Sequence, residues 1–242
     1  MTDQGLQARI VLCVLHDQPG IVRSICAEQA GFEYDETYSA QGPDPRMPAA
    51  FEASRCTVLP SLTDADRDAI VGHRDVAYVL SPRMHPATAS QIAATSLRLV
   101  KRLLDLGARA IKCESAGLTH GRERWSSLAS QDDPVALYGA WVRRPLASHG
   151  LLYSCGMHLL GFPDVELAGV SATDAVELID GFSLYQLIDR PGDRLLAGHT
   201  FSLRSTAPRF RLRRTACERY ERDDFFHNPQ GYWRLEPVSD LH

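Results

Sequence analysis

Residues 76–113, VAYVLSPRMHPATASQIAATSLRLVKRLLDLGARAIKC, decide the fold of the N-terminal half. They begin with the apolar, partly β-branched run Val76–Leu80, which predicts a strand. A helix is predicted over Ala87–Leu106, because leucine and isoleucine recur there at helical spacing and Gly107 follows as a stop signal. Ala110–Cys113 is again apolar and predicts a second strand. The stretch is therefore expected to form a strand–helix–strand unit.

The residues that precede this stretch begin the N-terminal half. Arg9–Leu15 (RIVLCVL) is a nearly continuous apolar run and predicts a strand covered on both faces. A helix is predicted to start near Pro19, with Asp17 as its N-cap, and to end at Gly31. Phe32–Tyr38 predicts a weaker strand.

The remaining N-terminal segments complete a known order of elements. Residues 40–49 hold three prolines and a glycine, which predicts a loop. Phe51–Leu59 then predicts a strand, and Thr63–His73 predicts a short helix. With the strand at Val76–Leu80 the order is β-α-β-β-α-β, the ferredoxin-like arrangement, extended by the helix and strand of residues 87–113.

The second half begins after a segment rich in glycine and small polar residues. Residues 115–147 predict two helices, one around Trp125 and one over Pro134–Arg144, and form a helical seam. A helix is also predicted over Thr173–Asp189. Strands are predicted at Leu151–Met157, Val165–Val170, Leu195–Leu203, Phe210–Thr215 and Tyr232–Leu235. We therefore expect an α+β fold with an α/β half (1–114), the seam, and a second half (148–242) built on a mixed or antiparallel sheet with helices.

Composition limits the classes of protein to consider. The chain has 242 residues and a net charge of −4, so it lacks the basic excess of most nucleic-acid binders. No run approaches the roughly 20 apolar residues that span a bilayer. The six cysteines are scattered without a CxxC pair, and the N-terminus does not resemble a signal peptide. These features predict a reduced, cytoplasmic protein that contacts neither nucleic acid nor membrane.

Motifs that would carry chemistry are missing from the sequence. It contains no phosphate-binding loop, no GxSxG nucleophile turn and no HxxxH pair, so no catalytic residue, metal ligand or cofactor is predicted. Pro163-Asp164-Val165-Glu166 resembles the first acidic element of restriction-enzyme-like nucleases, which also need a downstream lysine. Both lysines, Lys101 and Lys112, precede it. A strand-entry turn with surface carboxylates is the better interpretation.

Residues 208–224, PRFRLRRTACERYERDD, concentrate arginine and acidic side chains. In a strand, Arg209, Arg211 and Arg213 project to one face and Phe210 and Leu212 to the other. Three interpretations remain open: a half-buried strand with a basic wet face, neutralised by the acidic residues that follow; a protein interface; and a nucleic-acid surface. The first is favoured, and the last ranks lowest because the local charge excess is small.

Residues 76–129 and 150–167 resemble a bacterial family of unknown function whose members are encoded near polymorphic toxin and secretion loci. The matching positions are Leu106-Gly107-Ala108, Trp125 and Gly161–Glu166, which are mostly packing and turn residues. The resemblance carries no active site to transfer to this chain.

What the resemblance implies is an immunity protein. Such a protein would bind and neutralise a cognate nuclease toxin of type VI secretion without catalysis. The complex would contain one copy of each protein, or two copies of each if this chain forms a homodimer. The toxin-binding candidates are Arg209, Arg211, Arg213, Asp223, Asp224, Phe225 and Phe226. The alternative is an enzyme, a hydrolase, whose site is assembled at the junction of the two halves from a Cys or His near the seam.

Overall fold

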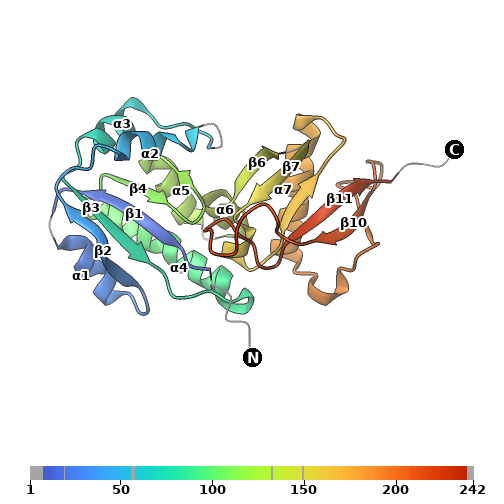
Figure 1. The fold of residues 1–242 in the computed structure, drawn as a ribbon, viewed down its shortest axis with the longest axis horizontal. Coiled ribbons are helices and arrows are strands. Elements are labelled where there is room, and N and C mark those ends of the chain that lie inside the picture. Colours follow the sequence, from blue (N-terminus) through green and yellow to red (C-terminus); the bar gives the residue numbers. More distant parts are fainter. Residues whose placement is uncertain (1–7, 19, 56–57, 132, 149, 239–242) are drawn as a thin grey trace.

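The chain forms two β-sheets that lie side by side along the long axis of the molecule (Figure 1). A computed structural model describes residues 8–18, 20–55, 58–131, 133–148 and 150–238. Within them are seven α-helices, a five-stranded sheet in the order β2-β3-β1-β4-β5 and a six-stranded sheet in the order β6-β7-β8-β11-β10-β9. The predicted α+β class is confirmed.

The first sheet is built on β1 (Val11–His16), in which every residue is buried. Strand β1 pairs antiparallel with β3 (Asp75–Leu80) on one side and with β4 (Ala110–Cys113) on the other. Helix α1 (Ile21–Glu28) connects β1 to β2 (Glu33–Gln41), which pairs with β3. Helix α4 (Pro86–Asp105) connects β3 to β4. Each strand–helix–strand unit thus has a strand of the other unit inserted between its own two strands, which is the ferredoxin-like arrangement.

The ferredoxin-like arrangement is as predicted, but some of the segments that form it differ from the predicted ones. The strand expected at Phe51–Leu59 is wrong: α2 (Met47–Glu52) and α3 (Asp64–Val71) fill the β2–β3 connection instead, with Cys56 and Thr57 outside the described residues. The predicted extension, α4 and β4, belongs to the core arrangement itself. Only β5 (Leu118–Thr119) extends it. The reason is a helical pair: Met47 and Phe51, four residues apart, pack together on one face of the first sheet.

One predicted helix cap is also wrong. Gly20, not Asp17, precedes α1, and its φ of +80° is one that glycine adopts without strain. Asp17 is instead paired with Arg109. An aspartate near the start of a helix is a usual N-cap signal, but the Asp17 carboxylate is engaged by the Arg109 guanidinium and does not cap α1.

The faces of the first sheet are covered differently. On one face α1 and α4 form a large core with α5 (Arg122–Gln131) and α6 (Pro134–Trp141). On the other face α2 and α3 cover only the part around Cys13, Leu15 and Val76. The rest of that face is free to form a site.

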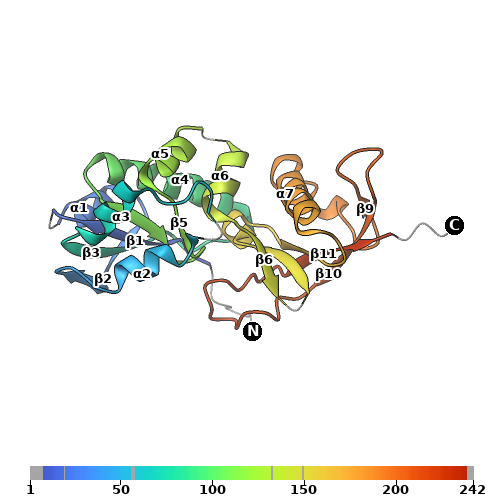
Figure 2. The same cartoon turned by 90° about the horizontal axis from the view of Figure 1, so that it is seen from above.

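The second sheet is mixed, which is one of the two arrangements expected for this half. Strand β8 (Asp164–Leu167) runs parallel to β11 (Tyr232–Pro237), and the other pairings are antiparallel. The remaining strands are β6 (Arg143–Ser148), β7 (Leu151–Cys155), β10 (Phe210–Thr215) and β9 (Thr200–Phe201), the last much shorter than predicted. Helix α7 (Ala172–Asp189) packs on one side of the sheet, and the β10–β11 connection lies on the other (Figure 2).

The hydrophobic core continues from the first sheet into the second half. A 3-10 helix, Met157–Leu160, packs against α4 and α6, and its Met157, Leu159 and Leu160 belong to the same buried cluster as the N-terminal core. The Ser90 hydroxyl on α4 donates to the Leu160 carbonyl at 2.8 Å. A second short 3-10 helix spans Gly192–Arg194. None of the helices described is long and apolar enough to cross a membrane.

Candidate binding cleft between the two sheets

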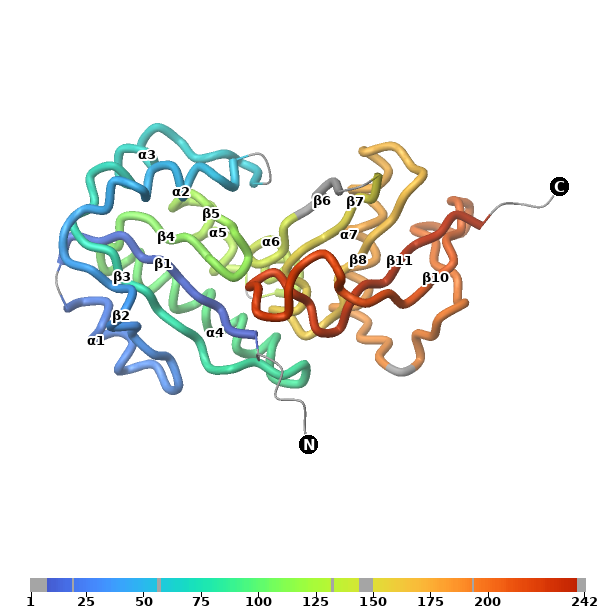
Figure 3. The backbone as a smooth tube through the Cα atoms, viewed as in Figure 1, coloured from blue at the N-terminus to red at the C-terminus, as the bar shows by residue number. Residues whose placement is uncertain are grey.

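A cleft of about 820 Å³ lies on the free part of the first sheet. The connection between β10 and β11, residues 216–231, reaches back from the second sheet and forms one wall (Figure 3). Segment 44–50, which includes the start of α2, forms the opposite wall. The site thus joins segments more than 160 residues apart in the sequence.

Strands β1, β3 and β4 supply the floor of the cleft. Val11, Tyr78 and Leu80 contribute apolar and aromatic surface. Lys112 and Glu114 form an ion pair at 2.7 Å, and both side chains are largely buried, at 13% and 23% exposed. Because alternate residues of a strand face opposite sides, Lys112 faces the cleft while Ile111 and Cys113 enter the helix-covered core.

Aromatic side chains and charges of both signs line the rim. Tyr38, which is 72% exposed, meets the Tyr78 ring edge-on with centroids 6.3 Å apart. Phe225 from the opposite wall is 54% exposed. Arg46 pairs with Asp44, whereas Arg83 and Arg222 make no ion pair within the described residues. The cleft therefore offers apolar surface between exposed charges.

The wall that carries Phe225 is anchored to the second sheet. Asn228 donates its side-chain amide to the Asp164 carboxylate at 2.7 Å and to the Phe162 carbonyl at 3.0 Å. His158 donates from Nε2 to the Phe225 carbonyl at 3.1 Å. The wall is thus held by two anchors, Asp164 and His158. Both are buried in the second half, so these bonds fix the position of the wall relative to the floor.

Burial perturbs the ionisation of both anchors. Asp164 also accepts from the Ser154 hydroxyl at 2.9 Å and from the Met157 amide at 3.2 Å. Burial nevertheless raises the pKa of Asp164 to about 6, because these bonds only partly offset desolvation. Burial lowers the pKa of His158 to about 4, so its ring is neutral at pH 7.

The seven predicted toxin-binding residues do not lie in one site. Asp223, Asp224 and Phe225 line the cleft. Phe226 is half-buried under the Arg143 guanidinium, 4.2 Å from its ring centroid, and therefore has a packing role. The three predicted arginines lie elsewhere, on the second sheet: Arg209, Arg211 and Arg213 are all exposed.

The predicted alternation along β10 is confirmed, but its neutralisation is not. Phe210 and Leu212 are buried against α7, and Arg211 and Arg213 are exposed. Arg213 pairs with Glu236 on β11 at 3.5 Å instead of with the acidic residues at 218–224. The reason is register, since Glu236 lies on the neighbouring strand while residues 218–224 turn away toward the first sheet.

A second groove, of about 620 Å³, lies beside Arg213 on the second sheet. Its lining includes Glu166, whose side chain is 3% exposed and accepts from Arg219 at 3.2 Å, Arg234 at 2.7 Å and Thr215 at 2.9 Å. The carboxylates of Asp164 and Glu166 are thus buried and bonded, which corrects their assignment to the surface. Both act as structural acceptors.

The cysteines and histidine near the seam are also buried. Burial raises the pKa of Cys113 and of Cys155 to about 12, which disfavours the thiolate that a nucleophile needs. His120 donates from Nε2 to the Ala140 carbonyl at 3.3 Å, and burial lowers its pKa to about 4. In the described part of the chain, no three His, Cys, Asp or Glu side chains are grouped so as to hold a metal ion.

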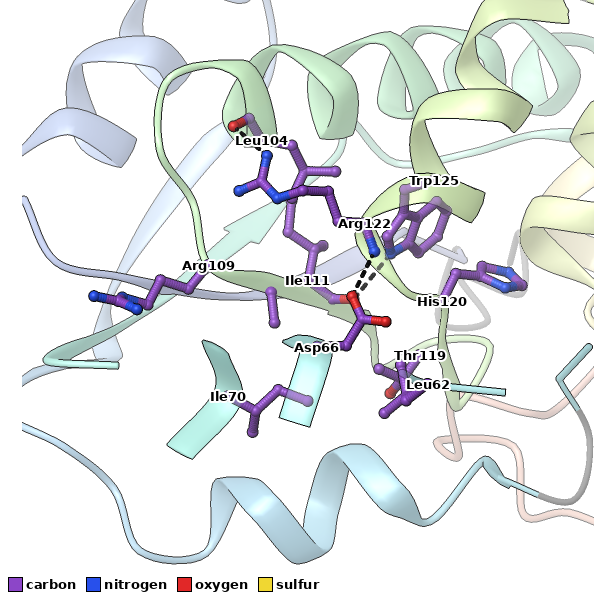
Figure 4. A pocket seen from close by; sticks show the side chains of 11 residues that line it. Leu62, Asp66, Ile70, Leu104, Arg109, Ile111, Thr119, His120, Arg122 and Trp125 are labelled. Carbon is purple, nitrogen blue, oxygen red and sulfur yellow. Dashed lines mark hydrogen bonds between the residues drawn. The ribbon is translucent and has the colours of Figure 1, made fainter. Parts of the chain in front are cut away.

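A cavity beside His120 is too small for a substrate. It measures about 10 Å³, roughly the size of one water molecule. Figure 4 shows that Asp66 and Arg122 fill the space around it: the Asp66 carboxylate accepts from the Arg122 amide at 3.0 Å, and Arg122 donates to the Leu104 carbonyl at 2.9 Å. The seam is closed here, and the larger cleft at the junction lies on the free face of the first sheet.

Sequence reasoning missed the N-terminal half of the cleft. Tyr38, Tyr78, Arg83, Lys112 and Glu114 line it, and none was predicted as a site residue. One signal was available: Lys112 interrupts an otherwise apolar strand, so one face of that strand cannot be ordinary core.

The chain matches no family model, and it has no significant match among the curated proteins or the solved structures.

Proposed function

We propose that this protein is an immunity protein, which binds a segment of a cognate nuclease toxin of type VI secretion in the cleft and so neutralises the toxin. The observation that carries the proposal is the pair of exposed aromatic residues, Tyr38 and Phe225, which both line a cleft whose floor includes the apolar and aromatic side chains of Val11, Tyr78 and Leu80. Exposed aromatic rings that gather around apolar surface mark interaction sites on proteins, because aromatic side chains are enriched at interface hot spots.

The chemistry of the cleft favours a protein partner. Aromatic and arginine side chains are enriched at interface hot spots, and the same cleft is lined by Arg83 and Arg222, which make no ion pair within the described residues. Asp223 and Asp224 on the same rim complement basic side chains, which a nuclease displays around its nucleic-acid site. Charges of both signs beside apolar and aromatic surface suit a polypeptide segment better than a uniformly charged polymer.

The test is co-expression with the product of the neighbouring gene, followed by size-exclusion chromatography and a growth assay. We expect the two proteins to co-elute and the toxin to be neutralised. Phe225→Ala and Tyr38→Ala should each weaken binding by about thirtyfold, as expected for hot-spot residues worth roughly 2 kcal/mol. Ile188→Ala is the matched control, because Ile188 is a 55% exposed apolar residue on α7, outside the cleft.

Two outcomes would count against the proposal. Separate elution without rescue of growth would remove the toxin partner. A complex weakened by Arg211→Ala or Arg213→Ala, but not by the two cleft variants, would place the interface on the second sheet and contradict the cleft assignment.

The second candidate function is an enzyme or small-molecule binder at the same junction. Its support is the volume of the cleft, because about 820 Å³ falls in the range of ligand pockets, and such pockets favour the meeting of two lobes. Saturable binding of a small metabolite that Phe225→Ala abolishes, without any complex with the neighbouring gene product, would favour this alternative.

A further inference from the structure

A separate pocket of about 300 Å³ lies on the opposite, helix-covered face of the first sheet. It opens at the end of the sheet, where β1 ends, β3 begins and the start of α1 approaches β2. His16 and Asp75 line it, and both are more than nine-tenths buried, at 5% and 8% exposed. They are direct partners across the antiparallel β1–β3 pair, so their side chains share one face.

Asp75 is a buried carboxylate that has no cationic partner among the residues that the structure describes. One oxygen, Oδ1, accepts from the Gly42 amide at 2.9 Å. No other hydrogen bond or ion pair to this carboxylate occurs within the described residues. Buried carboxylates in proteins are normally paired with a cation or hydrogen-bonded throughout, because desolvation of an isolated charge is costly.

The cationic side chains around the pocket are engaged elsewhere. Arg23 pairs with Glu36 at 2.5 Å, and Arg109 pairs with Asp17. His73 donates from Nδ1 to the Ile70 carbonyl at 2.6 Å and accepts from the Asp44 amide at Nε2, so both of its ring nitrogens are engaged.

His16 adds an acceptor next to Asp75. Its Nδ1 donates to the Gln18 carbonyl at 3.1 Å, which leaves the lone pair on Nε2. Burial lowers the pKa of His16, so the ring is neutral at pH 7 and above. Ser39 and Gln41 supply further oxygen atoms to the lining.

The rim of the pocket already holds a cation. The Arg23 guanidinium lies over the Tyr34 ring, 4.8 Å from the centroid, while pairing with Glu36. Both charged side chains are more than half exposed, so this pair can exchange with an entering ligand. An aromatic face beside a carboxylate is a favourable environment for a positive charge.

We propose that this pocket binds a small molecule through a primary ammonium group, with Asp75 and His16 as its acceptors and Tyr34 beside its alkyl chain. An ammonium group has three donors and no acceptor, which matches a lining of a carboxylate, an imidazole lone pair and neutral oxygens. The volume restricts the ligand to a small amine or diamine. The proposal is independent of the toxin-binding cleft, which lies on the other face of the sheet.

The test is isothermal titration calorimetry of the full chain at pH 8 with 1,4-diaminobutane, and with uncharged 1,4-butanediol as the matched ligand. We expect saturable binding of the diamine only. Asp75→Asn keeps an acceptor for the Gly42 amide but removes the charge, and should weaken binding by at least about tenfold. Asp35→Asn, on the cleft side of β2, should leave the affinity within about twofold.

Tyr34→Leu provides a second variant if Asp75→Asn fails to fold, and it should also weaken diamine binding. The proposal would be overturned if the diol bound as well as the diamine, or if the wild-type protein gave no saturable heat. It would also be overturned if Asp75→Asn bound the diamine with unchanged affinity or, where that variant does not fold, if Tyr34→Leu did. Binding of Zn²⁺ without binding of the diamine would overturn it in favour of a metal site.

Discussion

The buried carboxylate of Asp164 connects the second sheet to the wall of the cleft through a single side chain, Asn228. We expect Asn228→Ala to lower the free energy of unfolding by about 3 kcal/mol, because a buried charge loses a donor. The variant should also have a higher Asp164 pKa in the folded state than the wild-type value of about 6. Urea unfolding at pH 7 measures the first effect.

The control for this change is Gln230→Ala, two residues along the same wall. At Gln230 only backbone groups hydrogen-bond within the described residues, through its amide and its carbonyl. The free energy of unfolding of Gln230→Ala should differ from that of the wild type by less than about 0.5 kcal/mol. Similar losses for the two variants would contradict the anchoring role of Asn228.

The other buried anchor, His158, predicts a dependence of stability on pH. Its pKa is about 4 in the folded protein and near 6.5 when unfolded, so its contribution is fully present above pH 6.5 and is lost as the pH falls from 6.5 toward 4. Between pH 7 and pH 5 this loss is on the order of 2 kcal/mol. His158→Gln keeps a donor for the Phe225 carbonyl but does not titrate, so it should remove about that much of the pH dependence.

Asp164 acts in the opposite direction over the same range. Its folded pKa, about 6, lies above the unfolded value of 3.8, so its contribution is present at low pH and is lost as the pH rises through 6. The comparison of His158→Gln with the wild type, by urea unfolding at pH 5 and pH 7, cancels this common term. If the free energy of unfolding changed equally between pH 5 and pH 7 in the two proteins, the His158 ring would not be held neutral in the folded state.

At the scale of elements, helix α3 depends on a cap that also reaches α5. The Thr63 hydroxyl accepts from the Asp66 amide at 3.1 Å, and the Asp66 carboxylate accepts from the Thr63 amide at 2.9 Å. Asp66 additionally accepts from the Arg122 amide at the start of α5 (Figure 4). One side chain therefore joins two helices that are distant in the sequence.

Thr63→Ala should cost about 1 kcal/mol of stability, the usual value for loss of an N-cap. Asp66→Ala should cost about twice as much, because it also leaves the Arg122 amide without its acceptor. Asp68→Ala, on the exposed part of the same helix, is the control and should be near neutral. Thermal unfolding measured by circular dichroism checks the order, and an equal effect of the Thr63 and Asp66 variants would contradict the link to α5.

Element by element, the sequence predicts what local periodicity controls. Strands β1, β3 and β4 and helix α4 lie close to their predicted bounds, because their apolar patterns are long and uninterrupted. The strand prediction for Phe51–Leu59 is wrong, because an apolar run of a few residues fits a strand as well as a short helix, and Phe51 belongs to α2. Its packing partners, Cys13 and Val76, lie far along the chain and decide the outcome.

The cleft was harder to predict for the same reason. Asp223, Asp224 and Phe225 attract attention by composition, but nothing local says that their segment returns to the first sheet. The return depends on Asn228, His158 and Asp164, whose contacts join residues more than 60 positions apart. Single-sequence patterns do not contain contacts of that range.

At the scale of the whole molecule, the shared core predicts that the two sheets unfold together. Met157, Leu159 and Leu160 from the second half are fully buried in the N-terminal core cluster. The Tyr138 hydroxyl on α6 also donates to Asp180 on α7 at 2.9 Å. Neither half can separate without exposing this common apolar surface, so a single cooperative transition is expected.

Hydrogen exchange measures this cooperativity directly, because the slowest amides of an element report the free energy of the unfolding that exposes them. The slowest amides of β1 and of β11, the central strand of the first sheet and an inner strand of the second, should give the same free energy of opening. Leu160→Ala opens a cavity in the shared core and should lower both values equally, by about 3 kcal/mol. If β11 exchanged at a lower free energy than β1, or if Leu160→Ala affected one strand alone, the halves would be separate folding units.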